Sequence, residues 1–433
     1  MNRRASTVDR QPGAPLLIRL WLGLTALAPG LLNVLARRSH ARMGADPARL
    51  GERSGRATRE RPAGRLVWIH AASVGEVVSV TALARAVTAQ TGASLLVTTA
   101  TATGAATVAQ RLPEALHQFL PVDTPRAVAS FLTHWRPDAA LFVEGDLWPR
   151  LIRELAGHGT PMALINARAS RSRTRAPRSS GALLAPMHLV TVQEEALRGG
   201  LIALGLDPAR IHAPGNLKAD IPPPPVDDAT RDRIIAAATG RAVWAAVSTH
   251  PGEEAIVLDA HAQLAGDPLL LLAPRHPDRG DELAGELARR GLHVTRHSTG
   301  ALPGTTTQVH LVDTLGETGT IYAATGLALV GGSLLAGPGG HTPYEPASLG
   351  CAVLTGPHVR NFQAAFTALQ AAGAAREVRD AADLARVLTG LLADPGALHA
   401  MQQAAQAEQQ RQGGATARTL TLLAPILPSV PAP

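Results

Sequence analysis

The chain has 433 residues, of which 45% are hydrophobic, enough to bury the cores of two or three domains. Aromatic residues make up only 3% and are not interleaved with basic ones, which argues against a stacking platform for nucleic acid. Cys351 is the single cysteine, so the sequence excludes an internal disulfide and a cysteine metal cluster, and it fits a reducing compartment.

Positive charge is concentrated at the amino terminus. Residues 1–65 carry thirteen arginines against four acidic residues, a net charge of +9. Since the whole chain has a formal charge of +7, the remaining residues sum to about −2. The basic isoelectric point therefore describes the amino-terminal segment and not the body of the protein.

Residues 16–36 form an apolar segment with one charged residue, Arg19. As a single helix it would measure about 30 Å, the thickness of a bilayer core. Pro29 and Gly30 lie inside the segment, so a shorter helix lying in the membrane interface is the alternative.

Arginines flank this segment unevenly, with nine between Arg37 and Arg65 and three before the segment. The positive-inside rule then keeps the body of the protein in the cytoplasm. The Arg3-Arg4 pair would also suit a cleaved signal peptide, but the apolar run is long and Arg37-Arg38 follow it. We expect an amino-terminal membrane anchor.

Beyond residue 65, short apolar runs alternate with helical patterns such as 77–90 and 125–135. Asp123-Thr124-Pro125 is typical of a helix start. Ten strands are predicted, at 66–69, 94–99, 139–143, 162–166, 188–192, 242–248, 269–273, 308–312, 327–331 and 352–355. Two more helices are predicted near 380–411. The alternation predicts an α/β protein with two doubly wound, Rossmann-like domains facing a cleft.

Four consecutive prolines at 222–225 cannot continue a helix or a central strand, so they predict a stiff linker. The predicted domains are 1–40 (tail and anchor helix), 41–221 (first α/β domain), 222–230 (linker) and 231–433 (second α/β domain).

Candidate site residues of the first domain lie where predicted strands end, at the edge of a parallel sheet that faces ligands. Glu76 follows the run L-V-W-I-H-A-A-S-V-G and could act as a general base or could merely complement a helix dipole. Glu144 and Asp146 follow the strand A-A-L-F-V, and no further ligand cluster supports a metal there. Lys218 is the only lysine among 41 basic residues, which hints at a site that needs a compact point charge.

In the second domain, Arg275 follows the strand L-L-L-L-A, where a guanidinium could grip a phosphate or carboxylate. D-T-L-G-E, residues 313–317, ends another strand. The glycine turns at 331–333 and 339–341 would let backbone amides approach a nucleotide. Glu345 would open the next helix, where it could accept hydrogen bonds from ribose hydroxyls or only complement the dipole.

These motifs together resemble the 3-deoxy-D-manno-octulosonic acid (Kdo) transferases of lipopolysaccharide assembly, from the apolar segment to about residue 400. The resemblance rests on H-A-A-S-V-G-E, E-x-D-L-W-P, N-A-R-x-S, G-N-L-K, S-T-H-x-G-E-E, P-R-H-P-x-R, D-T-L-G-E, G-G-S, G-G-H-x-P-x-E-P-A and G-P-H-x-x-N-F. It implies a membrane-attached glycosyltransferase of the B fold at the cytoplasmic face of a bacterial inner membrane. Such an enzyme transfers Kdo with inversion from CMP-Kdo to a lipid A precursor, with no cofactor and no protein-bound metal.

The resemblance also implies roles for residues. Glu76 matches the proton acceptor, and Glu144 and Lys218 match positions that stabilise the transition state. Pro274, Arg275, Leu315, Gly316, Glu317, Thr342, Pro343, Tyr344 and Glu345 match the CMP-binding stretches. The first domain would then bind the acceptor and the second the CMP-sugar.

The sequence departs from the family pattern in a few places. Asp146 stands where the family usually has Glu, and Thr342 and Tyr344 replace Asn and Leu. The stretch 172–189 is short and interrupted by proline, which leaves the acceptor's identity open. The number of Kdo units and the oligomeric state are open as well. A related enzyme acting on another sugar nucleotide, such as an epimerase, and a periplasmic two-domain binding protein are the alternatives.

Overall fold

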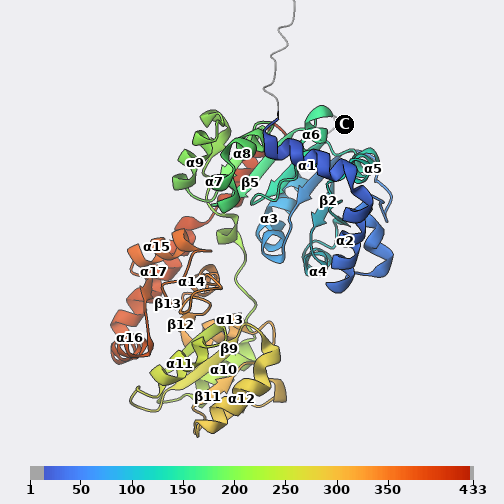
Figure 1. Cartoon of the computed structure of the whole chain (residues 1–433). Coiled ribbons are helices and arrows are strands. Elements are labelled where there is room, and N and C mark those ends of the chain that lie inside the picture. Colours follow the sequence, from blue (N-terminus) through green and yellow to red (C-terminus); the bar gives the residue numbers. More distant parts are fainter. Residues whose placement is uncertain (1–13, 430–433) are drawn as a thin grey trace, which may run out of the picture. The chain divides into compact units, whose positions relative to one another are not determined.

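The computed structural model describes residues 14–429, without the side chains of residues 171 and 172 (Figure 1). The chain forms two compact units. The first unit runs to Ile221 and includes the chain from Gly414 on, and the second unit runs from Pro222 to Gly413. Each unit contains one seven-stranded sheet whose paired strands are parallel.

The sheet of the first unit has the order β3-β2-β1-β4-β5-β6-β7. Its strands are β1 (Leu66–His70), β2 (Ser94–Thr99), β3 (Leu116–Phe119), β4 (Ala139–Val143), β5 (Met162–Ala167), β6 (Leu189–Val192) and β7 (Ile211–His212). The strand order reverses between β1 and β4, and in such sheets the reversal is the point beyond which ligands bind.

The helices of the first unit lie before, between and after these strands. They are α1 (Leu16–Leu27), α2 (Pro29–Arg42), η1 (Pro47–Ser54), α3 (Val74–Thr91), α4 (Ala102–Arg111), α5 (Pro125–Trp135), α6 (Pro149–Gly157), α7 (Arg171–Arg175), α8 (Pro177–Leu184), η2 (Glu195–Leu197), α9 (Arg198–Ala203), η3 (Pro208–Arg210), η4 (Leu217–Asp220) and α18 (Ala415–Leu423).

The second unit has the order β10-β11-β9-β8-β12-β13-β14, which reverses between β8 and β12. Its strands are β8 (Val243–Thr249), β9 (Leu269–Pro274), β10 (Val294–Arg296), β11 (Val309–Leu311), β12 (Leu327–Val330), β13 (Ala352–Thr355) and β14 (Ala375–Glu377). Its helices are α10 (Asp228–Ala237), α11 (Glu253–His261), η5 (Pro277–Arg279), α12 (Gly280–Arg289), η6 (His297–Thr299), α13 (Thr318–Thr325), α14 (Tyr344–Ser348), α15 (Gln363–Ala371), α16 (Ala381–Ala393) and α17 (Pro395–Gln412). The predicted α/β class with two doubly wound sheets is confirmed.

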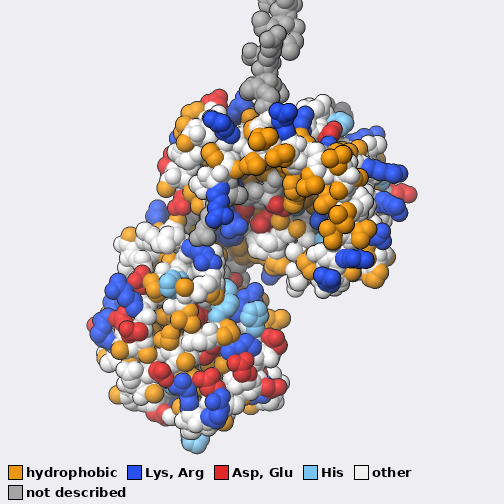
Figure 2. All heavy atoms as spheres, in the orientation of Figure 1, with side chains coloured by type: hydrophobic (Ala, Val, Ile, Leu, Met, Phe, Trp, Pro, Cys, Tyr) orange, Lys and Arg blue, Asp and Glu red, His pale blue; other side chains and the backbone are white. Residues whose placement is uncertain are grey.

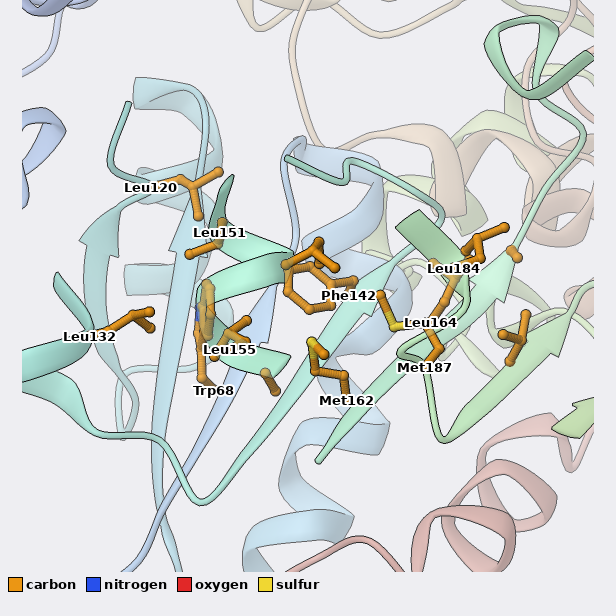
Figure 3. Packing of buried hydrophobic residues seen from close by; sticks show 14 of the residues in the cluster. Trp68, Leu120, Leu132, Phe142, Leu151, Leu155, Met162, Leu164, Leu184 and Met187 are labelled. Atoms are coloured by element: carbon orange, nitrogen blue, oxygen red, sulfur yellow. The ribbon is translucent and has the colours of Figure 1, made fainter. Parts of the chain in front are cut away.

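Apolar side chains on both faces of each sheet explain why the strands appear in the sequence as continuous apolar runs. On one face of the first sheet, Trp68 and Phe142 pack together with ring centroids 5.5 Å apart, beneath residues of α5 and α6 (Figure 3). On the other face, residues of α3, α4 and α18 cover β1, β2 and β4. These rigid sheets hold the strand ends in place.

The chain returns to the first unit at its carboxyl end, which differs from the prediction that residues 231–433 form one domain. Helix α18 packs on α3, and Asp220 accepts a hydrogen bond from the Gly414 backbone amide at 2.7 Å. The predicted linker 222–230 also ends early, because Asp227 caps α10 by accepting a hydrogen bond from the Thr230 amide. Both differences arise from contacts between residues far apart in the sequence.

The amino-terminal apolar segment is not one helix. It breaks at Ala28, before Pro29, into α1 and α2, which are bent by 87°. Within residues 14–429, no single helix is long and apolar enough to cross a membrane, and this bent pair alone passes that test by length and composition. The break follows from Pro29, which cannot donate the hydrogen bond that would continue α1.

Candidate active site

Two predicted carboxylates stand at the point where the strand order of the first sheet reverses. Glu76 lies in the first turn of α3, just after β1, and Glu144 directly follows β4. Since β1 and β4 are paired neighbours, both carboxylates belong to the same edge of the sheet. Their proximity is reflected in the pKa of Glu76, which Glu144 helps to raise.

Glu76 takes part in capping the start of α3. Its Oε2 accepts a hydrogen bond from the Ala72 amide at 2.7 Å, while Ser73 Oγ caps the helix by accepting from the Glu76 amide. Burial raises the pKa of Glu76, the Ala72 hydrogen bond lowers it, and the neighbouring Glu144 raises it further. Glu76 therefore caps the helix, and its raised pKa makes the carboxylate easier to protonate than an ordinary glutamate.

Glu144 has a strained backbone and a buried carboxylate. Its φ is +57°, in the left-handed region that residues other than glycine rarely adopt. Lys218 Nζ lies 2.6 Å from one of its carboxylate oxygens, and Arg168 Nε lies 3.1 Å from the other. The structure thus brings Glu144 and Lys218 into direct contact, although they are far apart in the sequence.

Lys218 is held in place by its own segment, η4. Asn216 Oδ1 accepts a hydrogen bond from the Lys218 amide at 3.0 Å, and Asn166 Oδ1 accepts one from the Leu217 amide at 3.0 Å. Asn166, on β5, has a φ of +55°. Asp220 ties the far end of η4 to the start of α18. Contacts on both sides of the lysine make this a pre-organised cation.

Asp146 does not share the partners of Glu144. His70 Nε2 lies 3.0 Å from the Asp146 carboxylate, and His70 Nδ1 lies 2.9 Å from Thr98 Oγ1. His70 Nδ1 also lies 3.1 Å from the Thr98 backbone carbonyl, so Thr98 holds one side of the ring and Asp146 the other. His70 is thus a fully buried positioning residue for Asp146.

A hollow of about 260 Å³ lies at the carboxyl edge of the second sheet. Seven of the nine predicted CMP-binding residues line it: Pro274, Arg275, Leu315, Gly316, Glu317, Thr342 and Glu345. Pro343 and Tyr344 are not among its lining residues; Tyr344 is buried and packs edge-on against Phe362. Most of the residues matched from the sequence therefore lie around one hollow, whereas Pro343 and Tyr344 are buried in the core.

Charged side chains in this hollow come from Arg275, Glu317 and Glu345. Burial raises the pKa of Glu345, while a hydrogen bond with Thr318 and the positive charge of Arg275 lower it. Leu315 is 79% exposed, so a large apolar side chain stands at the mouth of the hollow. A cation, a carboxyl group and an apolar surface are the features needed to bind a nucleoside phosphate.

Several amides of the glycine turns at 331–333 and 339–341 already bond within the protein. The amides of Gly332 and Leu334 donate to the buried Glu253 carboxylate at 2.7 and 2.8 Å, and the Gly340 amide donates to Gly332 O at 2.7 Å. A Cβ at Gly331 would lie 2.5 Å from Ser248 O, so close backbone packing requires a glycine there.

Sequence reasoning missed several residues around these sites. Arg173 donates to the Glu144 carbonyl at 2.8 Å. In the second unit, His250 Nε2 lies 2.8 Å from Nε2 of His341, which lines the hollow. Burial lowers the pKa of His341 to about 4, and His250, Arg275 and His276 lower it as well. Among residues 14–429, no group of three or more His, Cys, Asp or Glu side chains is arranged to hold a metal ion.

Comparison with known proteins identifies relatives of the whole chain. A family model described as 3-deoxy-D-manno-octulosonic-acid transferase matches residues 48–221. The 3-deoxy-D-manno-octulosonic acid transferase of Bordetella pertussis is 36% identical over 93% of this chain and 97% of its own length. A probable mitochondrial 3-deoxy-D-manno-octulosonic acid transferase of Arabidopsis thaliana is 33% identical over 90% of this chain and 91% of its own.

A solved structure of UDP-GlcNAc 2-epimerase from Neisseria meningitidis, bound to UDP-GlcNAc, has a TM-score of 0.59. It covers 84% of this chain and 100% of the epimerase chain at 14% identity, so it shows the glycosyltransferase B fold alone. The relatives at 33% and 36% identity, matched almost from end to end, go further than fold: the chain belongs to the 3-deoxy-D-manno-octulosonic acid transferase family of glycosyltransferases.

Proposed function

We propose that the protein transfers Kdo from CMP-Kdo to a lipid A precursor during lipopolysaccharide biosynthesis, at the cytoplasmic face of a bacterial inner membrane. The observation that carries the proposal is the group of Glu76, Glu144 and Lys218 at one sheet edge, in a chain of this family. In the second unit, the hollow lined by Arg275 and Glu345 supports a site for the CMP portion of the donor.

The proposed reaction is a single displacement. A glucosamine hydroxyl of the acceptor attacks the anomeric carbon of Kdo, the new C–O bond forms, and Glu76 takes the hydroxyl proton. The bond from that carbon to the CMP phosphate oxygen breaks, and its electron pair leaves with CMP, so the configuration inverts. The Lys218 ammonium, fixed beside Glu144, would stabilise developing charge. The proposal needs neither a cofactor nor a protein-bound metal.

Mass spectrometry of the product tests the reaction directly. Purified protein incubated with lipid A precursor and CMP-Kdo should yield acceptor whose mass has increased by one or more Kdo units. UDP-sugars in place of CMP-Kdo should yield no product. Product formed only from a UDP-sugar would instead support the alternative of an enzyme that acts on another sugar nucleotide.

Arg275→Lys should weaken CMP binding by about tenfold, because the change keeps the positive charge but loses the planar two-pronged donor that grips a phosphate. Isothermal titration calorimetry with CMP measures the change. Arg289→Lys is the matched control, since Arg289 is an exposed arginine at the end of α12 and does not line the hollow. If the unmodified protein and Arg275→Lys bind CMP with equal affinity, Arg275 does not bind the phosphate of CMP.

Membrane attachment is proposed to use the outer faces of α1 and α2. An apolar surface gathers over these helices (Figure 2). Its large exposed side chains are Leu16, Leu17, Leu20, Leu24, Leu27, Leu31, Val34 and Leu35; we call this set the leucine surface. Exposed Arg37 and Arg38 lie on α2 beside it, as expected for a helix pair lying on an anionic membrane.

Contacts of α1 with the body favour interfacial attachment over spanning. Trp21 Nε1 donates to the Asp123 carboxylate at 2.6 Å, and Arg150 donates to Leu22 O at 2.8 Å. Thr25, a residue of the same helix, is fully buried. A helix that crossed a bilayer would lose these bonds to the first unit, whereas a helix lying on the membrane keeps them.

Leu20→Gln combined with Leu24→Gln should lower binding to anionic phospholipid vesicles by at least about tenfold, because two large apolar side chains leave the lipid boundary. Co-sedimentation with vesicles measures the binding. The matched control is Ile202→Gln with Ile235→Gln, two exposed apolar residues that are not part of α1 or α2. If both double variants sediment like the unmodified protein, another surface attaches the protein to the membrane.

A further inference from the structure

Two apolar hollows in the first unit have no part in the reaction described so far. The larger, of about 860 Å³, lies between the start of α1 and α8 and is called here the α8 groove. It is lined by Ala14, Pro15, Leu16, Leu17, Ala176, Pro177, Arg178, Ser179, Gly181, Ala182, Ala185, Leu204 and Gly205. Apart from Arg178 and Ser179, these lining residues carry no polar side chain.

The smaller hollow, of about 200 Å³, is called here the α9 pocket. It is lined by Ala167, Arg168, Ala169, Ser170, Arg173, Thr174, Val192, Ala196, Leu197, Gly200, Leu201 and Leu204. The two hollows share Leu204, whose backbone carbonyl packs against α8: a Cβ at Gly181 would lie only 2.3 Å from that oxygen. The two hollows are separate but adjoin at Leu204, and together they are called here the apolar region, which reaches from α1 to the residues around Glu144.

Cations mark the inner end of this region. Arg168 and Arg173 both line the α9 pocket, and Arg173 donates to Arg168 O and to Glu144 O. Burial and then the positive charge of Arg168 lower the pKa of Arg173, so this guanidinium is held close to a like charge. Arg168 and Lys218 pair with the Glu144 carboxylate, and Arg173 donates to the Glu144 backbone carbonyl, so three cations gather around Glu144 and favour a further anion.

The outer end of the region opens at the leucine surface. Leu16 and Leu17 line the α8 groove and are 67% and 57% exposed. A chain leaving a membrane on which α1 lies could enter the groove without crossing water. Each methylene that stays out of water is worth about fourfold in affinity, so a groove lined mainly by apolar side chains would favour an acyl chain.

We propose that the α8 groove binds an acyl chain of the lipid acceptor, while Arg168 and Arg173 meet an anionic group on its sugar head. The inference rests on the proposed function, and it adds a lipid-chain site that sets acceptor specificity. It also gives the short segment of α7 and α8 a role, since α8 forms one wall of the groove. The protein's own amino terminus is a poor occupant, because residues 1–13 contain three arginines and an aspartate.

Ala182→Trp and Ala185→Trp test the groove, because both alanines line it and are exposed, so the added ring fills the groove without entering the core. The KM for the fully acylated lipid A precursor should rise at least tenfold in each variant. The KM for the same acceptor after removal of all its acyl chains should change less than twofold, and kcat should stay within twofold for both acceptors. Ala89→Trp, at an exposed alanine of α3 outside both hollows, is the control and should leave both KM values unchanged.

A second measurement does not depend on Kdo transfer. A phosphatidic acid with a photoreactive diazirine in one acyl chain, presented in nonionic detergent, should label the tryptic peptide 179–198 of the unmodified protein. Ala182→Trp should reduce that labelling at least fivefold, whereas Ala89→Trp should not.

The outcomes separate the two proposals. If the unmodified protein makes no product from CMP-Kdo but the peptide is labelled as described, the proposed function fails and the groove stands. If product forms, but filling the groove raises KM equally for both acceptors or not at all, the inference is overturned. Labelling confined to α1 and α2 would overturn it as well.

Discussion

Glu76→Gln is expected to lower turnover by about 10² to 10⁴-fold, because the amide cannot accept the proton of the attacking hydroxyl. The amide oxygen can still accept the hydrogen bond from the Ala72 amide, so the start of α3 should be preserved. Single-turnover transfer measures the loss, and CMP affinity and melting temperature should change little. Glu154→Gln, at an exposed position on α6, is the control and should retain full turnover.

The same assignment predicts the pH profile. Burial raises the pKa of Glu76, so the folded-state value lies above that of an ordinary glutamate. A general base must be ionised, so kcat/KM should rise with pH through this raised value and fall below it. In Glu76→Gln, kcat/KM should no longer rise with pH through this value. If the variant turns over almost normally and keeps the same rise with pH, Glu76 is a helix cap and not the general base.

Lys218→Ala is expected to cut turnover by about 10² to 10³-fold, comparable to the loss of one donor that stabilises charge in a transition state. CMP affinity should stay nearly unchanged, because an interaction made only in the transition state does not contribute to ground-state binding. Calorimetry with CMP, run alongside single-turnover transfer, separates the two effects. The contrast with Arg275→Lys, which should weaken CMP binding itself, makes each variant a control for the other.

Lys218→Arg tests why one lysine persists in a chain that otherwise uses arginine. Lys218 Nζ lies 2.6 Å from Glu144, and the side chain is only 18% exposed, so there is little space for a larger, planar guanidinium. We expect a loss of turnover close to that of Lys218→Ala. If Lys218→Arg turns over like the unmodified protein, the catalytic role of the lysine is wrong.

The strands show how much of the fold can be predicted from the sequence. All ten predicted strands are present, and the four that were missed, β3, β7, β10 and β14, are the outer strands of the two sheets. Central strands are covered on both faces and therefore appear as unbroken apolar runs. Edge strands are short and mix apolar with polar residues. β14, for example, has the sequence A-R-E, with two exposed residues.

The site residues divide in the same way. Strand ends followed by a carboxylate or a cation pointed to Glu76, Glu144 and Arg275, because the carboxyl edge of a parallel sheet is a local consequence of strand direction. Arg168 stood in the N-A-R-x-S motif but was not singled out, and no pattern marked Arg173. For the glycine turns, the sequence alone does not reveal that Glu253 accepts hydrogen bonds from the amides of Gly332 and the neighbouring Leu334.

The sequence by itself determined the ten inner strands, the boundary near the four prolines and the carboxylates at the strand ends, because these depend on local apolar pattern and backbone preference. The tertiary structure alone decided that Lys218 meets Glu144, that α18 returns to the first unit and that α1 is bonded to Asp123 and Arg150. Each of these is a contact between residues distant in the chain. Such contacts depend on side-chain packing and hydrogen-bond geometry in three dimensions, which no local pattern records.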